Sequence, residues 1–199
     1  MTDPISDNAL NTLFRRARSF NGWKDAAVPE LLMRAVYDLT KWGPTAANGC
    51  PARFIFLAKG AESKDRLKPF LDESNIEKTM TAPWTVICAH DLDFHEKLPE
   101  LFPHAPSAKD WFADAGEREV NAFRNGTLQS AYMLIAARAL GLDCGPMSGF
   151  DNVGVDGEFM TGERSQWRSN WLCNIGHGEH TSVLDRLPRL DFDDACVIL

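Results

Sequence analysis

Two amphipathic stretches open the chain, each with apolar residues three or four positions apart. This spacing puts the apolar side chains on one helix face and predicts helices over residues 7–18 and 28–42. The second stretch starts with Pro29 and Glu30, which suit a first helical turn, and Gly43-Pro44 ends it. Its expected core positions are Leu32, Ala35, Val36, Leu39 and Trp42.

Three short apolar runs have the length and the β-branched or aromatic content of buried strands. They cover residues 54–58, 84–89 and 171–176. The chain has no internal repeat, low-complexity tract or long linker, which predicts one α+β domain over residues 1–199.

The segments between and after these runs are shorter or more polar. The pattern predicts short helices over residues 63–71 and 75–80, and a long loop or a set of short helices over residues 91–110. The tail from Asp191 is expected to add an edge strand or to wrap a partner.

Residues 117–140 are predicted to form one long helix, ended by Gly141. Within its second half, from residue 127 to residue 142, the clearly polar side chains are Thr127, Gln129, Ser130 and Arg138. A helix that is apolar nearly all round must be buried on all sides. Two arrangements achieve this, a central helix between a sheet and a second subunit, or a helix buried within a monomer.

Charge and composition exclude several classes of function. The 199 residues carry a net charge of -7, which disfavours nucleic acids and anionic membranes because both require net positive charge. No run approaches the ~18 apolar residues of a membrane span, and the first residues lack the pattern of a secretory signal. The cysteines are dispersed, odd in number and free of Cys-x-x-Cys pairs, which suits reduced thiols in the cytoplasm.

Familiar catalytic motifs are absent. The sequence has no Walker loop, no Gly-x-Gly-x-x-Gly after a strand, no His-Glu-x-x-His and no Gly-x-Ser-x-Gly. The paired histidines, His90 with His95 and His177 with His180, are expected to be solvated loop residues rather than metal ligands. With no acid–base or nucleophilic centre indicated, a bound cofactor is expected to carry out the chemistry.

Two segments near the amino terminus suit a phosphorylated, ring-containing ligand. Arg18, Ser19 and Asn21 place a guanidinium, a hydroxyl and an amide at a helix end, which fits a phosphate; a solvated basic helix end is the alternative. Residues 44–51 put small residues and one amide between two prolines. Such a loop is rigid enough for a flat ring to lie against it, although a plain turn has the same composition.

Further candidates lie later in the chain. Asn75 and Lys78 are one helical turn apart on the same face. Residues 145–151 form a glycine-containing loop whose backbone N–H groups can approach a ligand closely. Arg186 and Arg189 add positive charge near the end of the chain.

In this order the segments resemble the flavin-dependent nitroreductase family, and within it the RutE-like branch of malonic semialdehyde reductases. The resemblance extends from about residue 10 to about residue 195. The matching segments are Arg18-Ser19, Val28-Pro29, Pro44 to Pro51, Asn75 to Lys78, Pro146 to Phe150, and Arg186 or Arg189. Two positions depart from the family pattern. Asn21 stands where many members have Lys or Arg, and Cys50 stands where many have Gln.

The resemblance implies a nitroreductase-like fold. It would have a central mixed or antiparallel sheet flanked by helices, a long buried central helix, and a domain-entwined homodimer with two active sites at the subunit interface. It also implies an FMN cofactor. The implied cofactor-binding residues are Arg18, Ser19, Asn21, Pro44, Thr45, Ala46, Asn48, Asn75, Lys78, Pro146, Met147, Ser148, Gly149, Arg186 and Arg189.

The implied activity is an NAD(P)H oxidoreductase that reduces a small acceptor by ping-pong hydride transfer through flavin N5. Lys78 and the backbone at Ser148 would tune the flavin, with no catalytic side chain and no metal. Malonic semialdehyde, reduced to 3-hydroxypropionate in pyrimidine degradation, is the acceptor that the branch implies. The alternatives are another flavoprotein of this fold, such as a broad nitroaromatic or quinone reductase, and a non-enzymatic dimeric interaction domain.

Overall fold

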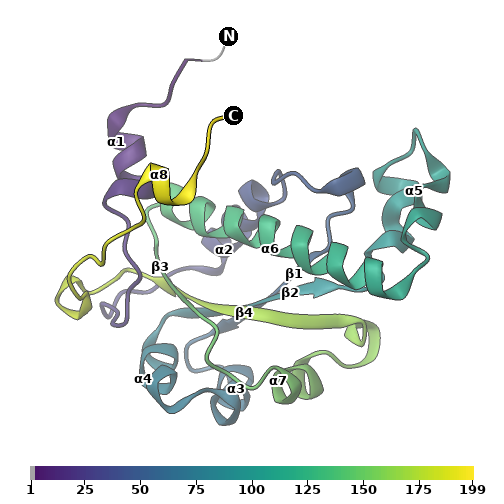
Figure 1. Ribbon diagram of the computed structural model, residues 1–199. Helices are drawn as coiled ribbons and strands as arrows, with labels where there is room; N and C mark the ends of the chain where they lie inside the picture. Colours follow the sequence, from purple (N-terminus) through teal and green to yellow (C-terminus); the bar gives the residue numbers. More distant parts are fainter. Residues whose placement is uncertain (1–2) are drawn as a thin grey trace.

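The computed structural model describes residues 3–199, so residues 1 and 2 of the predicted domain lie outside it. A four-stranded antiparallel sheet in the order β1-β2-β4-β3 forms the centre of the molecule (Figure 1). The strands are β1 (Ala52–Ala58), β2 (Trp84–Asp91), β3 (Asp143–Met147) and β4 (Trp167–Gly176). The helices are α1 (Asp7–Leu10), α2 (Glu30–Thr40), α3 (Glu62–Leu67), α4 (Glu73–Thr81), α5 (Leu98–Leu101), α6 (Ala115–Ala139), α7 (Asn152–Phe159) and α8 (Phe192–Ala195).

Helices cover both faces of the sheet, with α6 along one face and α3, α4 and α7 on the other (Figure 1). The alternation of side chains along β2 shows why its sequence is apolar throughout. Val86 and Cys88 join the core under α6 and α2, whereas Ile87 and Ala89 join the core on the opposite face. A third, smaller cluster around Phe94 lies under the short helices between β2 and α6.

The sequence pattern predicted most of these elements. The three apolar runs are strands, residues 91–110 form short helical segments, and α6 ends before Gly141, whose φ is 77°. The first predicted helix is shorter than expected, because after α1 the chain forms a π-helical turn over Asn11–Arg15.

The expected core positions of the second helix were partly wrong, and so was one of the two alternatives for the tail, the edge strand. Leu39 of α2 and Trp42, which lies beyond the end of α2, are exposed, and Met33 of α2 is buried. The tail adds no strand to the sheet within residues 3–199 but forms the exposed helix α8. Its short helical turn starts at Phe192, and the two acidic residues that follow suit the first turn of a helix.

The long helix α6 is not buried on all sides within one chain. The side of α6 that faces the sheet packs on it. The opposite side, here called the outer half of α6, exposes Val120, Phe123, Leu128 and Tyr132. The interpretation of this helix as buried within a monomer is therefore wrong. These four exposed apolar side chains share the outer side of α6 with polar residues such as Glu119 and Arg124.

Candidate functional site

A cavity of about 470 Å³ brings together the candidates from the two ends of the chain. It lies where the chain leaves the first helix and where residues 184–189 return over it. Its polar lining includes every residue that the sequence proposed for a phosphate, namely Arg18, Ser19, Asn21, Arg186 and Arg189. We call it the arginine cavity.

Residues 184–189, which precede the tail, form hydrogen bonds with the end of the first helix at this cavity. The Arg18 guanidinium donates to the carbonyl of Leu184, and Arg186 Nη2 donates to the carbonyls of Arg15 and Ala17, both at 2.9 Å. Arg186 therefore caps the carbonyl end of the first helix, where a cation is favourable. Among residues 3–199, Arg189 bonds only to the carbonyls of Leu187 and Pro188, so its guanidinium is less firmly fixed than that of Arg186.

Arg138 is a fourth arginine at the arginine cavity that was not predicted. It extends from the end of α6, where Nη1 donates to the carbonyl of Leu13 at 3.1 Å. Its Nε is buried and has no hydrogen-bond partner within residues 3–199. A buried N–H of this kind is costly unless an acceptor joins it, and a ligand phosphate would supply one. The signal in the sequence was a lone charge in an otherwise apolar half of a helix.

Strand β3 leads from the arginine cavity to the second group of candidates. At its start Phe20 N donates to the carbonyl of Cys144 at 3.1 Å, which places Ser19 and Asn21 against the strand. At its end Met147 is buried, and its sulfur accepts a hydrogen bond from Thr79 of α4. Met147 can thus meet a ligand only through its backbone, whereas Pro146 and Ser148 are exposed.

Asn75 of α4 holds the turn that follows β3. Its side-chain amide is buried and donates to the carbonyl of Gly149 at 2.6 Å. A Cβ at Gly149 would lie 2.5 Å from Asp72 Oδ2 and 2.6 Å from Asn75 Nδ2, so a larger residue would displace these two side chains. Two separately predicted candidates, Asn75 and Gly149, are thus in direct contact, and this contact fixes the backbone beside Ser148.

Lys78 lies one turn further along α4, with its backbone locked in place. Its carbonyl accepts hydrogen bonds from Trp23 Nε1 at 2.8 Å and from Asn174 Nδ2 at 3.1 Å. Its half-buried ammonium makes no hydrogen bond or ion pair in the described part of the chain. Lys64 of α3 donates to the carbonyl of Ala82, at the end of the same helix, at 2.6 Å. Burial lowers the pKa of Lys64 to about 7.

The loop of residues 44–51, here the 44–51 loop, has a strained backbone. Ala47, Asn48 and Cys50 have φ values of 50°, 51° and 43°, in the left-handed region that costs non-glycine residues energy. The loop is held to α6 by Asn125, whose Oδ1 accepts from Ala46 N at 2.8 Å.

The structure does not bring the 44–51 loop, with its candidates Pro44, Thr45, Ala46 and Asn48, to the arginine cavity. Asn125 and Arg138 lie on the same helix, and a rise of 1.5 Å per residue puts them roughly 20 Å apart. The loop and the cavity thus lie toward opposite ends of α6.

The histidines do not form a metal site, and two of them are not solvated as expected. His90 lies buried on β2 against Phe123, and His95 is buried in the following turn. Burial lowers the pKa of both imidazoles. Among residues 3–199 no group of three or more His, Cys, Asp or Glu is placed to hold a metal ion, and no helix is long and apolar enough to cross a membrane.

The fold and the site together define an α+β protein with helices on both faces of an antiparallel sheet and a cationic cavity suited to a phosphorylated ligand. The nitroreductase family profile matches residues 1–177. The chain belongs to the nitroreductase family and is an oxidoreductase of that type.

Two relatives are similar over almost their entire length. A protein of Stutzerimonas stutzeri (strain A1501) is 51% identical over 201 residues, covering 100% of both chains. A protein of Caulobacter vibrioides (strain NA1000 / CB15N) is 54% identical over 195 residues, covering 98% of both. Both carry the provisional name NADH dehydrogenase/NAD(P)H nitroreductase.

Solved structures share the fold at low sequence identity. A provisionally named nitroreductase of Exiguobacterium sibiricum 255-15, solved in complex with FMN, has a TM-score of 0.86 at 16% identity, covering 100% of both chains. The enone reductase CLA-ER, from a gut-bacterial fatty acid saturation metabolism, has a TM-score of 0.83 at 15% identity, covering 98% of this chain and 100% of that one.

Proposed function

We propose that this chain is an FMN-dependent NAD(P)H oxidoreductase. The observation that carries the proposal is the arginine cavity, from which β3 leads to the turn at Gly149 that contacts α4. Four guanidinium groups, with Asp185 as the acidic residue at the cavity, fit a phosphate of charge near -2. The unpartnered Nε of Arg138 also fits such an anion. The relatives' shared name, which mentions NAD(P)H, supports the electron donor.

Each group of residues would have a distinct task with FMN bound. The bound flavin would supply hydride transfer, accepting a hydride from NAD(P)H and delivering it to an acceptor. Arg18, Arg138 and Arg189 would bind the phosphate, while Arg186 fixes residues 184–189 around it. The Gly149 turn, held by Asn75, would present backbone N–H groups to the ring edge without a side chain in the way. Lys78 would place a positive charge beside the ring.

A homodimer would complete the site. The 44–51 loop lies too far from the arginine cavity to reach the same flavin from the same chain. A closed two-fold dimer that covers the outer half of α6 could bring the loop of one subunit to the flavin of the other. The exposed apolar residues of the tail, such as Phe192, Val197 and Ile198, support the proposal that the tail wraps the partner.

The acceptor we propose is malonic semialdehyde, reduced to 3-hydroxypropionate. The order of the matching segments supports this choice, while the relatives' names favour a nitroaromatic acceptor. A steady-state screen with NADH and NADPH against malonic semialdehyde, small enals, quinones and nitrofurans tests the proposal. The highest kcat/KM is expected for malonic semialdehyde, and a higher value for nitrofurans or quinones would contradict it.

Lys78→Met is expected to lower the flavin reduction potential by some tens of millivolts. A positive charge beside the ring interacts weakly with the neutral oxidised ring and strongly with the negative charge that reduction adds. Since ~30 mV corresponds to about 1.4 kcal/mol for a two-electron couple, a half-buried ammonium has an effect of measurable size. The variant should stay yellow. Spectroelectrochemical titration measures the shift, with Lys68→Met as an exposed control; equal potentials in both variants would remove Lys78 from the ring.

A further inference from the structure

We propose that Arg53 and Asp91 form a positioning pair that holds the 44–51 loop in its flavin-facing conformation. The proposal rests on the proposed function, because it assumes that the loop contacts a flavin. Neither residue belongs to the candidate cofactor contacts.

The backbone of the 44–51 loop is strained. Three of the four residues at positions 47–50 have left-handed backbones without being glycine. Such conformations persist only where the surrounding structure over-determines them. The loop therefore depends on its anchors for its shape, and loss of one anchor allows residues to relax to more favourable φ values.

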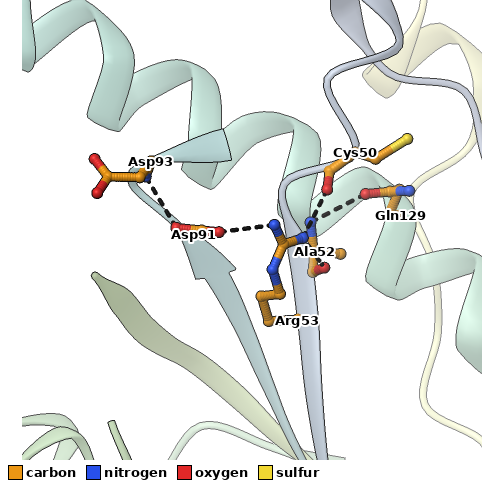
Figure 2. A network of polar contacts seen from close by, with 6 residues as sticks. All are labelled: Cys50, Ala52, Arg53, Asp91, Asp93 and Gln129. Carbon is orange, nitrogen blue, oxygen red and sulfur yellow. Dashed lines mark hydrogen bonds and ion pairs between the residues drawn. The ribbon is translucent and has the colours of Figure 1, made fainter. Parts of the chain in front are cut away.

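Arg53 anchors the carboxyl end of the loop (Figure 2). Arg53 Nη1 donates to the carbonyls of Cys50 and Ala52, both at 2.9 Å. Cys50 is the last strained residue of the loop, and its carbonyl precedes Pro51, which has no N–H of its own. Gln129 of α6 adds a bond to Ala52 N at 3.0 Å. One guanidinium thus fixes the point where the loop enters β1.

The Arg53 guanidinium is itself held in place by Asp91 and Trp167. Arg53 Nη2 lies 2.7 Å from Asp91 Oδ2, and the Asp91 and Arg53 side chains are only 14% and 23% exposed. The other oxygen of Asp91 accepts from Asp93 N at 2.9 Å, so the carboxylate cannot rotate away (Figure 2). The guanidinium also lies over the ring of Trp167, 5.8 Å from its centroid.

The geometry requires arginine rather than any cation. A guanidinium is a planar fork whose separate N–H groups reach the carbonyls and the carboxylate at the same time. A lysine ammonium is a point charge and would keep either the ion pair or the carbonyl contacts. We therefore expect Arg53→Lys to behave like Arg53→Ala.

The experiment compares Arg53→Ala and Arg53→Lys with wild-type protein and with the control Arg66→Ala. Arg66 of α3 has a similar but more exposed pair, with an ion pair to Glu158 at 3.3 Å and the ring of Phe159 at 5.8 Å, and its side chain is 52% exposed. Binding of FMN and of riboflavin, which lacks the phosphate, is measured by fluorescence titration. Thermal unfolding of the flavin-free protein is measured in parallel.

We expect both Arg53 variants to bind FMN and riboflavin about tenfold more weakly, by the same factor for the two ligands, because the loop acts on the ring. The flavin-free Arg53 variants should remain folded at the temperature of the titration, although their unfolding midpoints should fall further than that of Arg66→Ala because the Arg53 pair is more buried. Arg66→Ala should keep its flavin affinities within twofold of wild type. Arg53 variants with the affinities of the control, or a loss confined to FMN, would overturn the proposal. If wild-type protein bound neither ligand, the proposed function itself would have failed instead.

Discussion

Arg18→Ala is expected to weaken FMN binding by about 1.5–3 kcal/mol, the contribution of a hydrogen bond to a charged group. At 1.4 kcal/mol per tenfold change, this corresponds to roughly 10- to 140-fold in Kd. Arg18 lines the arginine cavity, and its guanidinium also binds the carbonyl of Leu184. The substitution therefore removes a phosphate partner and loosens the segment that carries Arg186 and Arg189.

The control is Arg16→Ala, two residues away, whose exposed side chain does not line the arginine cavity. Calorimetric titration with FMN and with riboflavin separates the phosphate from the ring. The loss in Arg18→Ala should be confined to FMN, because riboflavin offers no phosphate. Equal FMN affinity in the two variants would exclude Arg18 from the site.

Leu128→Glu is expected to convert a flavin-binding dimer into a monomer that retains no flavin. Leu128 is 44% exposed near the middle of the outer half of α6. Burying an unpaired carboxylate in a subunit interface costs several kcal/mol, which is comparable to the stability of many dimers. Loss of the dimer would separate the 44–51 loop of one subunit from the arginine cavity of the other.

Val153→Glu provides the matched control, because Val153 is 82% exposed on α7, on the opposite face of the sheet. Size-exclusion chromatography with light scattering gives the mass, and the absorbance of the same peak gives the bound flavin. The control should remain a yellow dimer. A wild-type monomer with bound flavin, or a Leu128→Glu dimer, would show that α6 is not the interface.

The sequence predicted those elements whose packing leaves a regular pattern. β2 and the second half of β4 are mostly buried and appear as apolar runs, and α6 has a clear stop signal at Gly141. The first half of β4, with Arg168, Ser169 and Asn170, is more polar and was not predicted. β3 was missed because Gly145 and Pro146, both poor strand formers, lie in its middle. Pro146 is tolerated because β3 is the last strand in the sheet order. The fourth strand is thus set by tertiary pairing with β4 and not by local propensity.

α7 was missed for a similar reason. Gly154 and Gly157 interrupt the helical pattern, and only Val155 and Phe159 of this short helix are buried. At Gly154 a Cβ would lie 2.3 Å from the ring of Phe70, so close packing requires the glycine that obscures the helix in the sequence.

The candidate site was predictable where the ligand chemistry lies in local clusters. Arg18, Ser19, Asn21, Arg186 and Arg189 carry their character in the sequence, although nothing in it shows that the two ends of the chain meet. Arg138 could not be assigned, because its role depends on the end of α6 reaching that cavity. The left-handed residues of the 44–51 loop were also invisible, since alanine, asparagine and cysteine do not signal a positive φ.

The central claim is tested most directly by anaerobic titration of the FMN-loaded protein with NADH and NADPH, followed by the visible absorbance of the flavin. Stoichiometric bleaching by at least one of the two nucleotides, reversed when an acceptor is added, is the result that the proposed function predicts. Protein that takes up no FMN, or bound FMN that stays yellow with an excess of both nucleotides, would contradict it.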